Sequence, residues 1–189
     1  MWRNTEQGYG LLAIVLHWLM AVLFLVLFAL GIWMVTLGYY DQWYNRGPYI
    51  HRSLGAIFFT LLLLRFGWRL ANPRPQFEAS VAAWEASLAL LVQWLFYCLL
   101  LLIPISGYLM TTARGSAVPV FDWFRIPATL RLPDHVDMLG NIHLYLSWLT
   151  VGLIVLHVVG ALKHHFFDKN KTLVKMLMPV NNDRGKNHD

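Results

Sequence analysis

Charged residues are scarce in this chain and absent from long parts of it. Asp, Glu, Lys and Arg make up 13% of the 189 residues and hydrophobic residues 58%, which excludes a disordered chain and disfavours an ordinary soluble domain. Three stretches, 7–40, 86–113 and 138–162, contain no charged residue. As a helix, each is long enough to cross the ~30 Å of hydrocarbon in a bilayer.

Cysteine is also nearly absent, since Cys98 is the only one. A single cysteine excludes a disulfide and a CxxC metal site within the chain, and it excludes the CxxCH motif that attaches haem covalently. Because Cys98 lies within the apolar stretch 86–113, we predict that its thiol is packed and unreactive.

The sequence predicts an all-α integral membrane protein built as a four-helix bundle. We expect spans at about 11–36, 48–70, 81–112 and 137–167, and the connection 114–136 to fold onto the membrane surface. The first apolar stretch far exceeds a signal-peptide core, so it should remain as a span. We expect one domain, 1–176, followed by a disordered cytoplasmic tail, 177–189.

Basic residues are unevenly distributed between the two sides of these predicted spans. With the N-terminus in the cytoplasm, the cytoplasmic side holds ten of the fifteen Lys and Arg residues and the outer side five. The positive-inside rule therefore places both termini in the cytoplasm. This topology accounts for the formal net charge of +5, so we expect membrane lipid and no nucleic acid as a partner.

Besides His164 and His165 at the end of the fourth span, four histidines lie inside predicted spans, where ionisable side chains are costly and mark functional sites. They are His17 near the cytoplasmic end of the first span, His51 at the outer end of the second, and His143 and His157 on the fourth. Taken singly, each is better explained as a hydrogen-bonded core residue. Four histidines at matched depths instead favour metal ligands.

The spacing of these histidines predicts two metal-binding pairs. His143 and His157 are 14 residues apart, a rise of about 21 Å that returns to within about 40° of the same helix face. The topology pairs His157 with His17 at the cytoplasmic level and His143 with His51 at the outer level. Each pair should bind one haem iron from opposite sides, as in cofactor sites of helix bundles. Both haems would be non-covalent and b-type, whereas zinc would need about four ligands gathered together.

The same 14-residue step recurs on the other two helices, from His17 to Gly31 and from His51 to Arg65. Gly31 would leave room at the outer haem, although small residues are common wherever membrane helices pack. Arg65 would pair with a propionate of the cytoplasmic haem. The alternative is an arginine that reaches the interface from a helix end. Arg52 is the second cation that we expect beside a haem.

Several short motifs in a fixed order resemble the bacterial cytochrome b561 family. They cover about residues 8–176 and comprise His17-Trp18, Ile50 to Gly55, Ile142-His143 with Trp148, Leu156-His157, and Lys163 to Lys169. The chain is most similar to the small di-haem members of the bacterial inner membrane, which include superoxide oxidase. This resemblance implies two haem b groups and electron exchange with ubiquinone.

The last span ends in a polar run just beyond His157. His165 lies eight residues further on, about 12 Å along the helix and near the same face. An imidazole there could hydrogen-bond a quinone head group and exchange its proton, and the family resemblance implies a quinone at this end. We therefore expect His165, and in second place His164, to act in quinone chemistry. The alternative is that both histidines only anchor the helix among lipid headgroups.

The outer side carries no broad electrostatic field. Its five arginines are opposed by Asp41, Asp122, Asp134 and Asp137, which leaves a net charge of +1, although Arg52 could attract an anion locally. Two axial histidines leave no open position on iron and favour outer-sphere electron transfer. We predict electron transfer between ubiquinone and superoxide, which would make the protein a superoxide:quinone oxidoreductase. A quinol-oxidising subunit for a periplasmic redox protein and a haem-free transporter with proton-relaying histidines are the alternatives.

Overall fold

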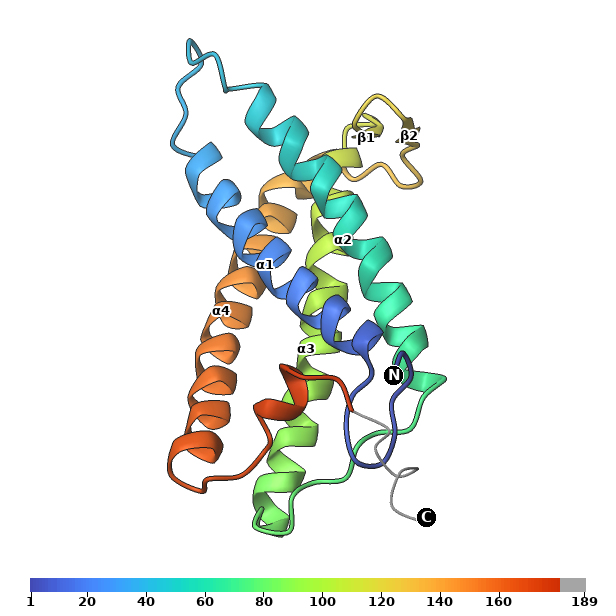
Figure 1. Ribbon diagram of the computed structural model, residues 1–189. Coiled ribbons are helices and arrows are strands. Elements are labelled where there is room, and N and C mark those ends of the chain that lie inside the picture. The colour runs from blue at the N-terminus through green and yellow to red at the C-terminus, as the bar shows by residue number, and fades with distance from the viewer. Residues whose placement is uncertain (181–189) are drawn as a thin grey trace, which may run out of the picture. The chain divides into compact units, whose positions relative to one another are not determined.

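The computed structural model describes residues 1–180, and residues 181–189 of the predicted tail lie outside the described part. Its helices and strands are labelled in Figure 1: α1 (Leu11–Met34), α2 (Arg46–Leu70), α3 (Ala83–Thr112), β1 (Val118–Val120), β2 (Phe124–Ile126), η1 (Pro133–His135), α4 (Val136–Phe166) and η2 (Val174–Met176). Four helices in the described residues are long and apolar enough to cross a membrane. They confirm the predicted all-α membrane protein with four spans.

Local chemistry places the helix ends within two residues of the predicted ones. α2 begins at Arg46, two residues earlier than expected, because Pro48 is tolerated in the first turn of a helix, where its missing N–H has no intrahelical partner to lose. α3 begins at Ala83, two residues later than expected. Glu85 caps this end, since its carboxylate accepts a hydrogen bond from the Ala82 N–H at 3.1 Å.

The long connection between α3 and α4 contains a small hairpin that the sequence did not predict. β1 and β2 pair antiparallel, with Val118 opposite Ile126. The fully buried Ser53 of α2 holds this hairpin, because its Oγ donates to the Pro119 carbonyl (3.2 Å) and accepts from the Phe121 N–H (2.9 Å). The hairpin is therefore fixed to the helix that carries His51.

Contacts divide the chain into two compact units. The hairpin unit comprises Met20–Leu62 and Leu95–Gly152 and includes β1 and β2. The termini unit comprises Met1–Leu19, Leu63–Trp94 and the described residues from Leu153 onward. Each of the four helices contributes one part to each unit, so each unit draws side chains from all four helices.

In the termini unit, the two ends of the described chain lie side by side (Figure 1). The Val180 N–H donates to the Tyr9 carbonyl at 3.1 Å. The indole N–H of Trp18 on α1 donates to the Met176 carbonyl at 2.9 Å. Val180, which lies in the segment 177–189 that we assigned to the tail, thus hydrogen-bonds to the N-terminal segment.

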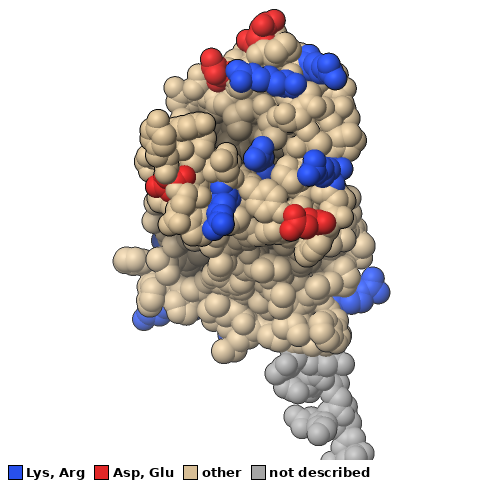
Figure 2. All heavy atoms as spheres, turned by 90° about the horizontal axis from the view of Figure 1, so that it is seen from above, with Lys and Arg blue, Asp and Glu red and all other residues tan. Residues whose placement is uncertain are grey.

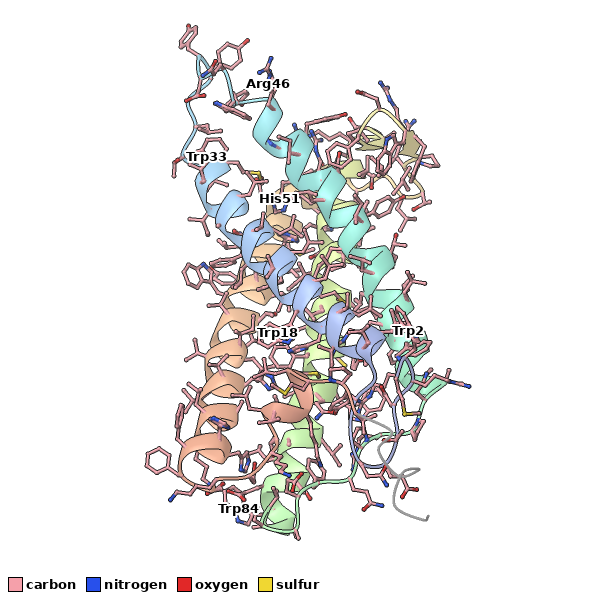
Figure 3. The ribbon with its side chains drawn as sticks, in the orientation of Figure 1. Trp2, Trp18, Trp33, Arg46, His51 and Trp84 are labelled. Atoms are coloured by element: carbon pink, nitrogen blue, oxygen red, sulfur yellow. The ribbon has the colours of Figure 1, made fainter. Side chains whose placement is uncertain are left out.

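Apolar side chains cover the outside of the helices. Leu25 and Leu149 are 52% and 59% exposed, as suits a surface that meets lipid rather than water. Figure 3 shows Trp33 at the end of α1, a position typical of interfacial anchors. Cys98 of α3 is also exposed, so the prediction of a packed thiol is wrong. The unbroken apolar run of α3 did not reveal which of its faces turns outward.

Candidate functional site: two histidine pairs

In the hairpin unit, His51 of α2 faces His143 of α4 with 6.2 Å between their ring centroids. The His143 Nδ1–H donates to the Ile103 carbonyl of α3 at 2.9 Å, and Ser106 Oγ donates to the same oxygen at 2.8 Å. Because a carbonyl only accepts, Nδ1 carries the proton of the neutral ring. The Nε2 lone pair of His143 is therefore free to bind a metal.

Two glycines make room for these rings. A Cβ added at Gly107 of α3 would lie 3.0 Å from Cε1 and 3.1 Å from Nδ1 of His143. A Cβ added at Gly31 of α1 would lie 3.2 Å from Cε1 of His51, whose side chain is labelled in Figure 3. The buried Nδ1 of His51 has no hydrogen-bond partner among the described residues. α1 and α3 supply no ligand to this pair, yet they shape its surroundings.

In the termini unit, His17 of α1 faces His157 of α4 with 6.3 Å between their ring centroids. Arg65 of α2 lies at the same level, because its Nη2 is 3.2 Å from His17 Nδ1 and its Nη1 donates to the Ala13 carbonyl at 3.5 Å. The Arg65 charge also acts on His157. Three helices thus bring two imidazoles and one cation together.

The Arg65 contact selects one tautomer of His17. A guanidinium only donates, so His17 Nδ1 accepts and Nε2 carries the proton of the neutral ring. A metal bound through Nε2 requires the proton on Nδ1 instead. Metal binding would therefore release Arg65 from this nitrogen and free its guanidinium for another acceptor.

Both pairs fit a haem iron held between two imidazoles. Metal–nitrogen bonds of about 2 Å on each side put two opposed imidazole ring centres about 6 Å apart. The observed centroid separations are 6.2 Å and 6.3 Å. The structure thus brings together both predicted pairs, His51 with His143 and His17 with His157, and haem binding by them stays a prediction.

Arg52 follows His51 on α2 and is partly buried. Its Nε donates to the Pro48 carbonyl at 3.0 Å, and its charge acts on His51. Figure 2 looks onto the end that carries β1 and β2, where basic and acidic side chains are interspersed. Neither sign forms one broad patch in this view. Arg52 is therefore a local charge beside the His51 ring rather than part of a steering field.

The end of α4 carries a second group of polar side chains. Lys163 bridges two carboxylates, Glu85 of α3 at 2.6 Å and Asp168 at 2.8 Å. His164 Nδ1 lies 2.7 Å from the same oxygen of Asp168. Hydrogen bonds, first from Lys163 and then from His164, hold the pKa of the Asp168 carboxyl below its ordinary value. His165 has a buried Nδ1 with no hydrogen-bond partner among the described residues.

Three side chains of this group, Glu85, His164 and Asp168, place one ligand atom each within 4.8 Å of one another. That spacing would suit a metal ion. Lys163 already bridges both carboxylates, however, so their charges are partly neutralised without one.

The contribution of α3 to the first pair was missed from the sequence. Ile103 acts through its main-chain carbonyl, which no side-chain pattern reveals. Gly107 was not singled out because glycines are common in membrane helices. One sequence feature could have indicated this contribution of α3. In the run from Pro104 to Gly107, a proline, a serine and a glycine interrupt an otherwise apolar span.

Known proteins resemble this chain along almost its whole length. Residues 8–179 match the prokaryotic cytochrome b561 family. Cytochrome b561 homolog 2 of Escherichia coli (strain K12) is 42% identical over 183 residues, which cover 96% of this chain and 97% of that protein. A Yersinia pestis protein named "Probable superoxide oxidase CybB" is 28% identical over 173 residues, 91% of this chain and 97% of that protein. The chain therefore belongs to the prokaryotic cytochrome b561 family of haem b-binding, electron-transferring membrane proteins, and its four spans make it a multi-pass member.

Proposed function

We propose that the chain binds two haem b groups, one between His17 and His157 and the other between His51 and His143. The observation that carries this proposal is the pair of facing imidazoles in each unit, with ring centroids 6.3 Å and 6.2 Å apart. Haem b, when bound, supplies reversible one-electron chemistry at its iron. Two histidine ligands on each iron would leave no open position for oxygen, which favours outer-sphere electron transfer.

Arg65 and Arg52 are proposed to set the charge around these two sites. Once His17 binds through Nε2, Arg65 loses its acceptor on that ring and becomes available to a haem propionate. Arg52 is tied to the Pro48 carbonyl, which keeps its charge beside His51. Each site would then have one cation in partly buried surroundings, where charges act more strongly than in water.

Ubiquinone is the proposed electron-exchange partner at the end of α4. The buried and unpartnered Nδ1 of His165 supports this, because a quinone oxygen would satisfy that nitrogen. His164 is less suited to contact the quinone through Nδ1, since that atom is bonded to Asp168. By the positive-inside rule this end lies in the cytoplasm, and the membrane is the bacterial inner membrane.

Superoxide is the proposed electron donor at the opposite side. The name of the Yersinia pestis relative supports this substrate, and Arg52 offers a cation to an anion that approaches His51. The electrons would then pass one at a time to ubiquinone, which makes the protein a superoxide:quinone oxidoreductase. The competing function is a quinol-oxidising subunit that passes electrons to a separate periplasmic redox protein.

Stopped-flow mixing of the purified, oxidised protein with superoxide separates these two functions. Our proposal predicts that superoxide reduces the haem bands. It also predicts that superoxide loss above the rate of spontaneous dismutation continues only while ubiquinone is supplied. A dedicated subunit would be reduced by ubiquinol but not by superoxide, and that result would contradict the proposed substrate.

A further inference from the structure

We propose that His164 and Asp168 form a proton-exchanging pair that serves the quinone at the end of α4. This inference rests on the proposed function, because it concerns the protons that accompany electrons to the same quinone. Conversion of a quinone to a quinol takes two electrons and two protons. A quinone that binds at an apolar membrane protein therefore needs a group that exchanges protons with water.

The hydrogen bond between these two residues determines which atom of His164 can exchange a proton. The Asp168 carboxylate only accepts, so the Nδ1–H of His164 donates to it at 2.7 Å. Nε2 is then the ring atom that gains or loses the exchangeable proton, and the carboxylate stabilises the charged ring. Lys163 holds the same Asp168 oxygen at 2.8 Å, which keeps the carboxylate in place.

Charged groups from two elements face His164. They are Asp168 and Lys163 on its own segment and Glu85 from α3. The lowered pKa of the Asp168 carboxyl keeps it ionised near neutral pH, so Asp168 is the positioning residue and the imidazole carries the proton.

The exposure of these side chains supplies a route for protons. Side-chain exposure is 43% for Lys163, 23% for Asp168 and 16% for His164, so the pair is not sealed inside the protein. His165, the next residue, holds the buried and unpartnered Nδ1 that we assign to the quinone. The two neighbouring histidines thus have different roles: His165 binds the quinone and His164 exchanges the proton.

The proton step balances in both directions of electron flow. During quinone reduction, His164 gives its Nε2 proton toward the quinone oxygen and takes another from water, once for each of two protons. During quinol oxidation, the neutral ring takes the proton and releases it to water. The electrons come from or go to the haem of the proposed function, and His164 and Asp168 transfer none.

The test is the rate of ubiquinone-dependent haem oxidation in the purified, haem-loaded protein, measured by stopped flow from about pH 5 to pH 8. Asp168→Asn keeps a hydrogen-bond acceptor but removes the charge, and Asp168→Glu restores it. Glu78→Gln is the matched control. Glu78 pairs with Lys175 at 2.6 Å in the same unit, close to the 2.8 Å between Asp168 and Lys163, and this pair involves no histidine.

We expect Asp168→Asn to slow the reaction at pH 7 about 10- to 100-fold and to change its pH profile, since the ring loses the anionic partner that positions it. Haem spectra and the KM for ubiquinone should not change, Asp168→Glu should recover most of the rate, and Glu78→Gln should match the wild type. A wild-type rate and pH profile in Asp168→Asn, or a change in KM alone, would contradict the proposed proton exchange by His164 and Asp168.

A second variant keeps the inference testable if Asp168→Asn does not fold. His164→Gln removes the titrating ring and should flatten the pH profile between about pH 5 and pH 8. An unchanged profile in this variant also overturns the pair. Failure of the proposed function looks different, because the wild-type protein itself would then show no ubiquinone-dependent haem oxidation.

Discussion

Replacing Gly107 with alanine should selectively weaken the site between His51 and His143. The new Cβ would stand 3.0 Å from Cε1 of His143, whereas ordinary contacts of a Cβ begin at 3.4 Å. The ring cannot retreat freely, because its Nδ1–H is bonded to the Ile103 carbonyl of the same helix. It must therefore rotate and strain that bond, or α3 and α4 must separate around it.

The size of the effect follows from two opposing contributions. Overpacking of a filled site costs about 1–3 kcal/mol. Alanine in a helix interior is about 1 kcal/mol more favourable than glycine, which offsets part of that cost. The net cost of up to about 2 kcal/mol falls on the ring that would bind iron. The middle of the range, about 1 kcal/mol, should lower the affinity of this site for haem about 5-fold, and its upper limit should lower it about 30-fold.

Haem retention measures this loss directly. Purified Gly107→Ala protein would be incubated with an excess of a haem-scavenging protein, and the two haem components would be resolved by redox titration of the reduced-minus-oxidised spectrum. Gly67→Ala is the matched control, since a Cβ at Gly67 of α2 meets no atom within 4 Å. The reasoning is refuted if Gly107→Ala retains both components as well as the control does, or loses both to the same extent.

Four further substitutions test other parts of the site. His17→Ala and His51→Ala should remove different haem components in optical redox titrations, because their partners lie in different units, and loss of the same component would contradict the pairing. Arg65→Leu should lower the potential of the His17 haem by on the order of 50 mV, roughly 1 kcal/mol for one electron, and an unchanged potential would favour a structural arginine. His165→Ala should slow ubiquinone-dependent haem oxidation and leave both spectra intact, whereas wild-type kinetics would place the quinone elsewhere.

The spans and the histidine pairs could be predicted from the sequence because both depend on strong local signals. An apolar run without charges has no stable place except a membrane, and a histidine within such a run stands out. The 14-residue step from His143 to His157 then assigns each histidine to a level through helix geometry alone. The structure places His51 and His17 opposite these residues at nearly equal distances.

The parts that were missed depend on contacts between segments far apart in the chain. Glu85 meets Lys163 only after α3 and α4 have packed, and the Ile103 carbonyl contacts His143 through the main chain. The exposure of Cys98 likewise depends on which face of α3 turns outward. The sequence of an evenly apolar helix does not indicate that face. The sequence indicated the polar residues at the end of α4. Only the structure shows that His164 is bonded to Asp168 and that Nδ1 of His165 has no partner among the described residues.

The number of haem groups per chain tests the central claim most directly. A pyridine haemochrome assay on the purified protein, referred to its amino-acid content, gives that number without any assumption about substrate. Our account predicts two b-type haems per chain, with both extracted by acidic acetone because neither is covalently attached. A value of one would mean that one histidine pair binds no haem. A value of zero would support the haem-free transporter instead.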